Sequence, residues 1–320
     1  MKLAGRFGRK VFTLFAIASF LFACASNFLL YFSNEHFPTL AKLQINHPKL
    51  SSRPIRSRHT VNWPMIVGHR GRGRISTNPE VDFIGNTKHA IKSAIYENPD
   101  WIEIDVRKTG DSRTTLVVFH DEYLDKKTTG SGKVEEQQLG TLQSHEVLVG
   151  RINNEPERIL TLNEVFLEFH QKGRRWILDI KSKGVRNELL RLIDKYSIPP
   201  EHFILFGDHE VLRDYADTDF RRGYTTLFSK HTGMLISYSN VLKRCEENEY
   251  SLLVVPIVFV TPRLTRKAEK MDIEVWSYGS NHPKDLQYCL NCGIKGLIVD
   301  HPRSVIEQLK TRKSQEAASD

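Results

Sequence analysis

The stretch Trp101–Asp121, WIEIDVRKTGDSRTTLVVFHD, joins two β-rich runs that carry an unusual set of polar side chains. The first run is apolar but contains Glu103 and Asp105, and the second ends in His120 and Asp121. Successive side chains of a strand point to opposite faces, so the two carboxylates share one face and the neighbouring isoleucines share the other. In a barrel the isoleucines would face the helices, and both carboxylates would point inward.

Short apolar strands alternate with helical segments from Met65 onward, which is typical of a parallel sheet covered by helices. We predict strands at Met65–Gly68, Trp101–Val106, Trp176–Ile180, Phe203–Phe206, Gly223–Leu227, Leu252–Pro256, Ile273–Tyr278 and Gly296–Val299. Eight strands in about 240 residues have the size of an α/β fold of the (β/α)8 TIM barrel type. An open doubly wound sheet is the second possibility, although no glycine-rich nucleotide fingerprint supports it.

The run Thr115–His120 is a further β-rich segment, separated from the Trp101 strand only by RKTGDSRT. A parallel crossover takes about a dozen residues or more, so this linker is too short for one. We therefore predict a hairpin-like excursion after the second strand of the barrel.

Two helical segments have clear end signals. In TLNEVFLEFHQKG, Thr161 and Glu164 form a capping box and Gly173 ends the helix. The segment HPKDLQYCLNCGIKG predicts a second helix that carries Cys289 and Cys292 as a CxxC motif near its C-terminal end. The negative end of a helix disfavours thiolates, so we interpret this pair as a packed helix face and not as a redox or metal site.

The first 32 residues differ in character from the rest. A basic flank, residues 1–10, precedes the apolar run Val11–Phe32, which at about 22 residues can cross a bilayer as a helix. The basic flank favours a cytoplasmic N-terminus. We favour an uncleaved single-pass membrane anchor, which places the catalytic domain in a periplasmic, lumenal or extracellular space. A cleaved signal peptide, with Ala23 and Ala25 before the cut, or a lipoprotein signal at Cys24, is the alternative.

The remaining segments are a polar, proline-bearing linker at 33–62, the barrel at 63–310 and a polar tail at 311–320. The formal net charge is +8, but Lys and Arg are spread along the chain and no basic run is interleaved with aromatic residues. This distribution argues against a nucleic-acid partner and indicates at most a weak attraction to phosphate-bearing or anionic-lipid surroundings. The sequence does not indicate an oligomeric state.

The strand WILDIKS repeats the polar pattern of the Trp101 strand, because Asp179 and Lys181 share a face at its C-terminal end. Active sites of parallel barrels lie at that rim, so three acids and one lysine can meet there. Carboxylates confined in an apolar mouth repel one another, and a cation relieves the repulsion. An all-oxygen set suits one divalent cation, Mg²⁺ or Ca²⁺. A rim salt bridge to Arg107 or Lys108 is the alternative for the first two acids.

The first strand, MIVGHRGRG, ends in His69, Arg70 and Gly71. Gly71 allows a sharp turn, and the guanidinium of Arg70 can bind a phosphate through two nitrogens. With His120, the chain then has two imidazoles that end neighbouring segments. Such a pair can serve as a base that takes a proton and an acid that returns one to a leaving group.

In their order, these motifs resemble the glycerophosphodiester phosphodiesterase family over residues 65–305. The matching motifs are HRG (69–71), GNT (85–87), EID (103–105), VVFHDEYL (117–124), TTGSGKV (128–134), LTLNEV (160–165), LDIKS (178–182) and VWSYG…GIKGLIVDHP (275–302). The resemblance implies a TIM-barrel enzyme that uses a divalent metal to hydrolyse glycerophosphodiesters to glycerol 3-phosphate and an alcohol. It implies metal ligands at Glu103, Asp105 and Asp179, an acid/base pair at His69 and His120, phosphate contacts at Arg70 and Lys181, and a wall of the glycerol pocket at Trp276.

Three departures from the family pattern limit this transfer. Gly85 replaces the glutamate of the usual Glu-Asn-Thr motif, after a longer loop, and Asp179 replaces a glutamate. The usual Trp-Thr-Val-Asn is here Trp276–Gly279 with the sequence WSYG. We expect an active enzyme with altered substrate preference. The alternatives are phospholipase C-like or D-like cleavage of membrane lipids on the same fold, and a barrel that binds phosphate ligands without turnover.

Overall fold

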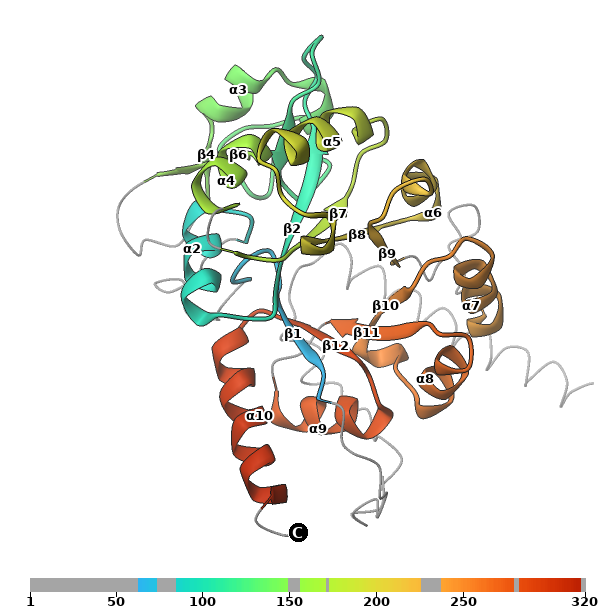
Figure 1. Ribbon diagram of the computed structural model, residues 1–320. Coiled ribbons are helices and arrows are strands. Elements are labelled where there is room, and N and C mark those ends of the chain that lie inside the picture. Colours follow the sequence, from blue (N-terminus) through green and yellow to red (C-terminus); the bar gives the residue numbers. More distant parts are fainter. Residues whose placement is uncertain are drawn as a thin grey trace, which may run out of the picture. The chain divides into compact units, whose positions relative to one another are not determined.

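In the computed structural model, which describes residues 63–73, 85–148, 156–170, 173–225, 237–278 and 282–317, parallel strands close into a ring (Figure 1). Within these residues the ring has eight strands: β1 (Met65–Gly68), β12 (Gly296–Val299), β11 (Glu274–Tyr278), β10 (Leu252–Pro256), β9 (Arg221–Tyr224), β8 (Phe203–Gly207), β7 (Trp176–Ile180) and β2 (Trp101–Lys108). Strand β1 pairs with both β12 and β2, so no ring edge stays open. The predicted parallel barrel is confirmed.

The inside of the barrel is filled by alternate side chains of the strands. This inner core consists of Val67, Trp101, Ile177, Ile204, Phe206, Leu252, Val254, Trp276 and Ile298. Its largest rings need glycines beside them: Gly296 is opposite Trp276 in the register, and a Cβ at Gly223 would lie 2.6 Å from the Phe206 ring. Glu103 and Asp105 follow Trp101 on the same inward face, as expected, and both are buried.

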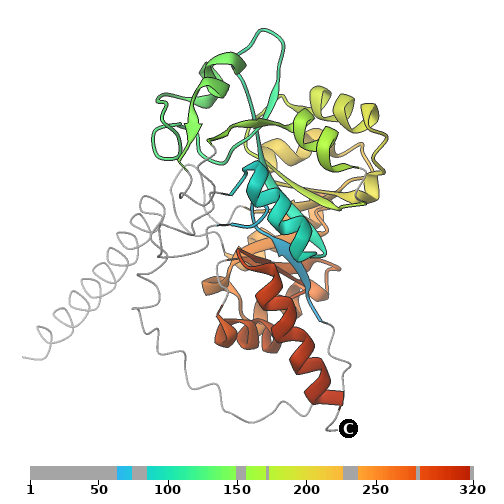
Figure 2. The same ribbon diagram turned by 90° about the vertical axis from the view of Figure 1, so that its left-hand side faces the viewer.

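Helices cover the outside of the ring. They are α2 (Lys88–Glu97), α4 (Leu162–Phe169), α5 (Arg186–Lys195), α6 (His209–Leu212), α7 (Tyr238–Glu247), α8 (Pro262–Glu269), α9 (Pro283–Cys292) and α10 (Pro302–Ala317), with 3-10 turns η4 (Pro200–His202), η5 (Arg213–Tyr215) and η6 (Ile257–Phe259). Figure 2 shows α2 and α10 next to each other along the barrel wall. The outer core between ring and helices includes Ile102 and Ile104, so the isoleucines of β2 face the helices.

The structure confirms the capping box of α4 and the end of α9, but α4 ends at Phe169 with His170 as its C-cap and not at the predicted Gly173. The Thr161 side chain accepts from the Glu164 amide, and the Glu164 side chain accepts from the Thr161 amide, which completes the capping box of α4. Helix α9 ends at Gly293, whose φ of 75° is left-handed. Cys289 and Cys292 are buried in the outer core, and burial raises the pKa of Cys289 to about 12. This pKa keeps the Cys289 thiol protonated, in agreement with a packed helix face.

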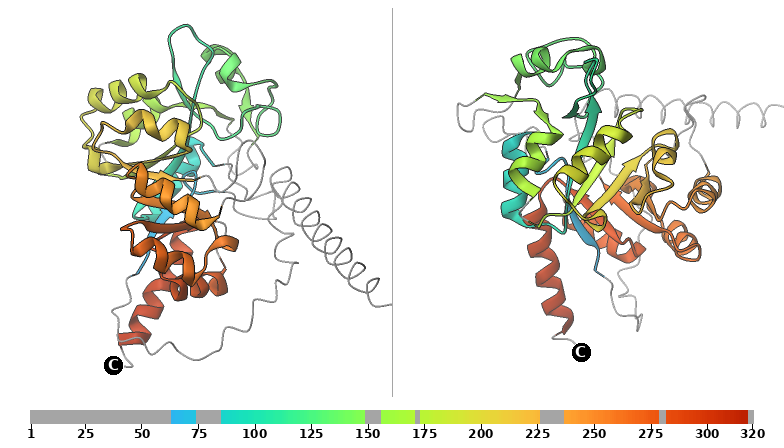
Figure 3. Two further views of the ribbon diagram at one scale, coloured as in Figure 1. Left: turned by 90° about the vertical axis from the view of Figure 1, so that its right-hand side faces the viewer. Right: turned by 45° about the horizontal axis from the view of Figure 1, so that its top comes forward.

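The excursion after β2 is an antiparallel layer at the carboxyl end of the barrel (Figure 3). Strand β3 (Leu116–Val118) pairs antiparallel with β2 and with β6 (Leu160–Thr161), so the predicted hairpin is confirmed. The layer also contains η2 (Val134–Glu136), α3 (Leu139–Ser144), β4 (Glu146–Val147) and β5 (Glu157–Arg158). Its own small core consists of Val117, Phe119, Leu124, Val134, Leu142, Val147 and Ile159.

Two further segment boundaries differ from the prediction by more than two residues. Strand β9 begins at Arg221 and ends at Tyr224, whereas we predicted Gly223–Leu227. The Arg222 side chain is buried with its guanidinium 5.2 Å from the centre of the Tyr250 ring, so a charged residue is accommodated inside the strand. Residues 311–317 of the predicted loose tail continue helix α10.

The N-terminal predictions for residues 1–62 lie outside the described residues. Among the residues that are described, none of the helices combines the length and the apolar character that a membrane span requires.

The glycine opposite Trp276 provides a test of the inner core. We expect Gly296→Ala to lower the free energy of unfolding by about 1–3 kcal/mol, because the new Cβ would overlap the Trp276 ring and force the core to shift. The control is Gly140→Ala in α3, where no heavy atom lies within 4 Å of the new Cβ. This change should be neutral or stabilise by up to about 1 kcal/mol. Urea unfolding of both variants measures the difference, and equal midpoints would contradict the packing.

Candidate active site

Three carboxylates converge at the carboxyl end of neighbouring strands. Glu103 and Asp105 lie on β2, Asp179 lies on β7, and Asp105 is opposite Asp179 in the strand register. One oxygen from each of the three side chains lies within 4.8 Å of the others. Strands in a sheet are about 4.8 Å apart, so the parallel register places Asp105 beside Asp179, and Glu103 lies two residues away on the same face of β2. The set consists only of carboxylate oxygens, which fits a hard divalent cation, and the shorter Asp179 still reaches the group.

The three acids carry an electrostatic cost that the protein does not fully offset. Burial, together with the nearby charges of Asp105 and Asp179, raises the pKa of Glu103 well above its usual range. One Glu103 oxygen accepts from the Arg70 amide at 2.7 Å, which only partly opposes this effect. A bound cation would add the missing positive charge, so the residues present fit a metal site.

Asp105 is the best-compensated acid of the three. Burial alone would raise its pKa, but Lys181, His120 and Arg70 together lower it. The Asn86 side chain adds two hydrogen bonds, because its Nδ2 donates to Asp105 Oδ2 at 2.8 Å and its Oδ1 accepts from the Asp105 amide at 3.1 Å. Asp105 is therefore an anion that is anchored from several elements.

Two cations lie against these acids. Lys181 Nζ is 2.6 Å from Asp179 Oδ2 and 3.1 Å from Asp105 Oδ1. Burial alone would lower the pKa of Lys181, but the neighbouring carboxylates raise it. Arg70 Nε is 3.3 Å from Asp105 Oδ2. Both cations therefore stay charged and lie against the acid cluster.

Arg70 reaches this place through an unusual turn. Its φ is 52°, a left-handed value that costs energy for a residue with a Cβ, and Gly71 follows with a φ of 82°. The turn is held because the Arg70 amide donates to Glu103 and the Arg70 carbonyl accepts from the Asn86 amide at 2.8 Å. A Cβ at Gly85 would lie 2.5 Å from the Cβ of Arg70, so the glycine found in place of the usual glutamate gives the Arg70 side chain its room.

Each of the two predicted histidines is paired with an aspartate. His69 Nδ1 is 2.7 Å from Asp300 Oδ1, and His120 Nδ1 is 2.6 Å from Asp121 Oδ1. Burial alone would raise the pKa values of both aspartates, but the paired histidine lowers them. Both side chains are therefore carboxylates, which can only accept hydrogen bonds. Nδ1 of each ring therefore donates, and Nε2 of each ring is left to exchange a proton.

The two pairs lie around the same guanidinium. The charge of Arg70 interacts with Asp105, Glu103, Asp300 and Asp121, which connects both histidine–aspartate pairs to the acid cluster. Burial is the main reason that the pKa of His120 is lowered, and Asp105 and Asp121 act in the opposite direction. The structure thus brings all predicted catalytic, metal and phosphate residues to one end of the barrel.

Sequence reasoning missed the partners Asp300, Asp121 and Asn86. Each follows or lies within a motif that we had singled out, and Asp300 comes directly after β12 as His69 comes directly after β1. Neighbouring parallel strands end at the same rim, so this shared position was the available signal.

Trp276 lies deeper than the other predicted site residues. It is 1 % exposed, and its ring packs edge-on against the Phe206 ring, with 6.3 Å between the ring centres. Its Nε1 donates a hydrogen bond to Glu274 Oε2 at 2.8 Å. It therefore forms part of the floor beneath the barrel mouth. Gly279 of the same motif lies outside the described residues.

The rim alternative for the acids does not match the contacts. Arg107 NH1 is 3.3 Å from Glu135 Oε1, and Arg107 Nε donates to the His120 carbonyl at 3.0 Å. The cations within ion-pair distance of Asp105 are instead Arg70 and Lys181.

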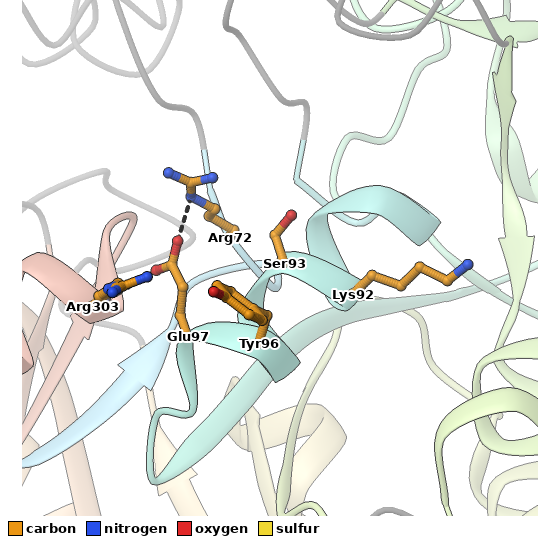
Figure 4. A pocket seen from close by; sticks show the side chains of 6 residues that line it. All are labelled: Arg72, Lys92, Ser93, Tyr96, Glu97 and Arg303. Atoms are coloured by element: carbon orange, nitrogen blue, oxygen red, sulfur yellow. Dashed lines mark hydrogen bonds and ion pairs between the residues drawn. The ribbon is translucent and has the colours of Figure 1, made fainter.

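A pocket of about 360 Å³ has none of the three acids in its lining, and its side chains are drawn in Figure 4. It is lined by Arg72, Lys92, Ser93, Tyr96, Glu97 and Arg303. Its cationic residues have acidic partners within the protein: Arg72 Nε is 2.7 Å from Glu97 Oε1 and Lys92 Nζ is 3.3 Å from Glu168 Oε1. Glu97 also accepts from the Arg303 amide at 3.1 Å. This pocket therefore adds no unpaired charge to the chemistry at the barrel mouth.

Comparison with known proteins finds similarity to one family of enzymes. Residues 69–196 match the model of the glycerophosphoryl diester phosphodiesterase family. A glycerophosphodiester phosphodiesterase of Caldanaerobacter subterraneus subsp. tengcongensis is 27% identical over 254 residues, which cover 77% of this chain and 98% of the relative.

Solved structures show the same fold. A phosphodiesterase of Oleispira antarctica, in complex with the product sn-glycerol-3-phosphate, has a TM-score of 0.62 and 19% identity, over 77% of this chain and 97% of that chain. A glycerophosphodiester phosphodiesterase of Thermotoga maritima has a TM-score of 0.59 and 22% identity, over 78% of this chain and 99% of that chain.

The His120–Asp121 pair gives a direct test of the site electrostatics. We expect Asp121→Asn to lower the pKa of His120 further, because the carboxylate that favours the charged imidazole is removed. NMR titration of the His120 ring protons in metal-free buffer measures the change. The control is Glu122→Gln, since Glu122 is next in sequence but pairs with Lys133. An unchanged or raised pKa of His120 in Asp121→Asn would contradict the pairing.

Proposed function

We propose that this chain is a phosphoric diester hydrolase of the glycerophosphodiester phosphodiesterase family. It splits glycerophosphodiesters into glycerol 3-phosphate and an alcohol. The reaction uses two histidines and one divalent cation. The observation that carries the proposal is the convergence of three buried carboxylates with two histidine–aspartate pairs around Arg70. The Oleispira antarctica relative was solved with sn-glycerol-3-phosphate, which supports the proposed product.

The positive side chains bind and orient the substrate. Arg70 and Lys181 present fixed cationic groups to the phosphodiester oxygens, and burial strengthens their attraction to the anion. Glu103, Asp105 and Asp179 would hold a divalent cation, Mg²⁺ or Ca²⁺, that adds positive charge where negative charge grows on the phosphate oxygens. Trp276 forms the floor below, which we propose limits how deeply the glycerol end can enter.

The two imidazoles move the protons. One Nε2 takes a proton from the attacking oxygen, which belongs either to water or to the neighbouring hydroxyl of the substrate, as the new phosphorus–oxygen bond forms. The other Nε2 gives a proton to the departing alcohol as the old phosphorus–oxygen bond breaks. If the substrate's own hydroxyl attacks first, water opens the resulting cyclic phosphate in a second step with the roles of the histidines reversed. Asp300 and Asp121 keep the rings oriented throughout, because each accepts from Nδ1.

Histidine variants and metal removal test this mechanism. We expect His69→Ala and His120→Ala each to lower kcat by about a hundredfold or more, since each removes one proton-transfer group. Excess EDTA should abolish turnover, and Mg²⁺ or Ca²⁺ should restore it. His202→Ala is the matched control, because His202 lies in η4 before β8, at the opposite end of the barrel.

Glycerophosphocholine, glycerophosphoethanolamine and intact phospholipids form the substrate panel, with the released glycerol 3-phosphate and alcohol quantified. Normal turnover in either histidine variant or in EDTA would reject the mechanism. Turnover restricted to intact phospholipids would reject the proposed substrate class.

We also propose that Val11–Phe32 anchors the chain in a membrane with the barrel on the non-cytoplasmic side, on the basis of its apolar length and basic flank. The purified membrane fraction should then contain a chain with its original N-terminus that resists extraction with alkaline carbonate. Mass spectrometry of the N-terminal peptide decides the matter. A mature chain that begins at Cys24 or Ser26 would overturn the anchor in favour of cleavage.

A further inference from the structure

Two segments that carry the site meet at one carboxylate of the excursion, Glu135 of η2. Glu135 Oε1 accepts from Ser182 Oγ at 2.6 Å and from Arg107 NH1 at 3.3 Å. Ser182 follows Lys181 after β7, Arg107 follows Asp105 by two residues on β2, and neither partner is a proposed metal ligand or acid/base group.

The Arg107 guanidinium extends this contact to the second histidine. Its Nε donates to the His120 carbonyl at 3.0 Å while its NH1 is directed to Glu135. The Phe119 amide of the same turn donates to the Asp105 carbonyl at 3.1 Å. Arg107 therefore holds the peptide that carries the His120 ring, and its side chain is only 11% exposed.

The Ser182 hydroxyl extends the contact in the other direction. Ser182 is buried, and its Oγ accepts from the Lys108 amide at 3.2 Å while donating to Glu135. Because Ser182 is bonded to Lys181, its position constrains the start of the Lys181 side chain. One carboxylate thus connects the backbone that carries His120 with the backbone that carries Lys181.

The backbone next to Glu135 is in close contact with the β2–β3 turn. The Gly110 amide donates to the Gln137 carbonyl at 2.7 Å, and a Cβ at Gly110 would lie 2.8 Å from the backbone of Glu136. The β2–β3 turn therefore has room only for a glycine at position 110, and η2 lies directly against this turn.

We propose that Glu135, acting through Arg107 and Ser182, is a positioning residue that sets His120 and Lys181 in place for catalysis. We call these three residues the clasp. The inference rests on the proposed function, because it assigns the clasp to the same reaction. A displacement of about 1 Å in a catalytic group can cost about a hundredfold in rate, so a contact that touches no substrate can still control turnover.

The experiment compares Glu135→Ala, Glu135→Gln, Arg107→Ala and the double variant Glu135→Ala/Arg107→Ala in the full chain. We expect Glu135→Ala and Arg107→Ala each to lower kcat about tenfold to a hundredfold with KM changed less than about threefold, because groups that act in the transition state are displaced. The double variant should be little worse than either single variant, since both break one unit. Glu135→Gln should retain most of the rate, because its amide oxygen can still accept from Ser182 and Arg107.

Glu136→Ala is the matched control, because Glu136 lies in the same 3-10 turn and is exposed. Its kcat and KM should equal those of the wild-type chain. Calorimetric binding of Mg²⁺ should be the same in all variants, since no clasp residue is a proposed ligand. A purely structural role would instead lower kcat in parallel with the thermal midpoint and would not be rescued by Glu135→Gln.

An activity-independent measurement separates the clasp from the proposed function. Hydrogen–deuterium exchange of peptides that cover residues 117–124 and 178–184 should be faster in Glu135→Ala and unchanged in Glu136→Ala. If the unchanged chain does not turn over any phosphodiester, the proposed function fails, while the exchange comparison still decides whether the clasp exists. Unchanged exchange, or wild-type kcat in a folded Glu135→Ala variant, overturns the clasp.

Discussion

Three carboxylates buried together at the mouth of a barrel are the constraint on which the rest of the site depends. Like charges in a poorly solvated place are costly, and the cost is visible in the raised pKa of Glu103. Lys181 and Arg70 lie against the acids and offset part of this cost. The backbone at Arg70 adopts a left-handed conformation, which brings its side chain to Asp105. Such an arrangement serves stability poorly, because buried ion pairs rarely exceed the cost of their desolvation. It fits the cation and phosphate binding that we propose.

The closure of the sheet decides which residues meet around these acids. Because β1 pairs with both β2 and β12, His69 lies next to Asp300 although 231 positions separate them in the chain. His120 arrives differently, two residues after the antiparallel strand β3 of the excursion, which is bonded to β2. The excursion therefore supplies half of the proposed acid/base pair, so its attachment to the rim bears on the proposed catalysis. The clasp is placed where that attachment occurs.

Patterns in the sequence predicted much of the fold because each one reports a local requirement. The alternation of strands and helices, the short linker before Thr115 and the Thr161–Glu164 capping box each depend on neighbours within a few residues. Strand β9 was displaced in the prediction because Arg222 reads as a surface residue, whereas its guanidinium is buried beside Tyr250. The end of α10 was missed because its last two turns are polar and look like a tail.

The amino-acid sequence by itself determined which side chains carry the proposed chemistry. Glu103 and Asp105 two residues apart in an apolar strand must share a face, and this holds for any strand, because side chains alternate. The tertiary structure decided the partners: Asp300 and Asp121 for the histidines, Asn86 for Asp105, and Glu135 for Arg107. Local periodicity carries no information about which strand ends lie side by side. Only the register and closure of the ring bring such distant residues within hydrogen-bond distance.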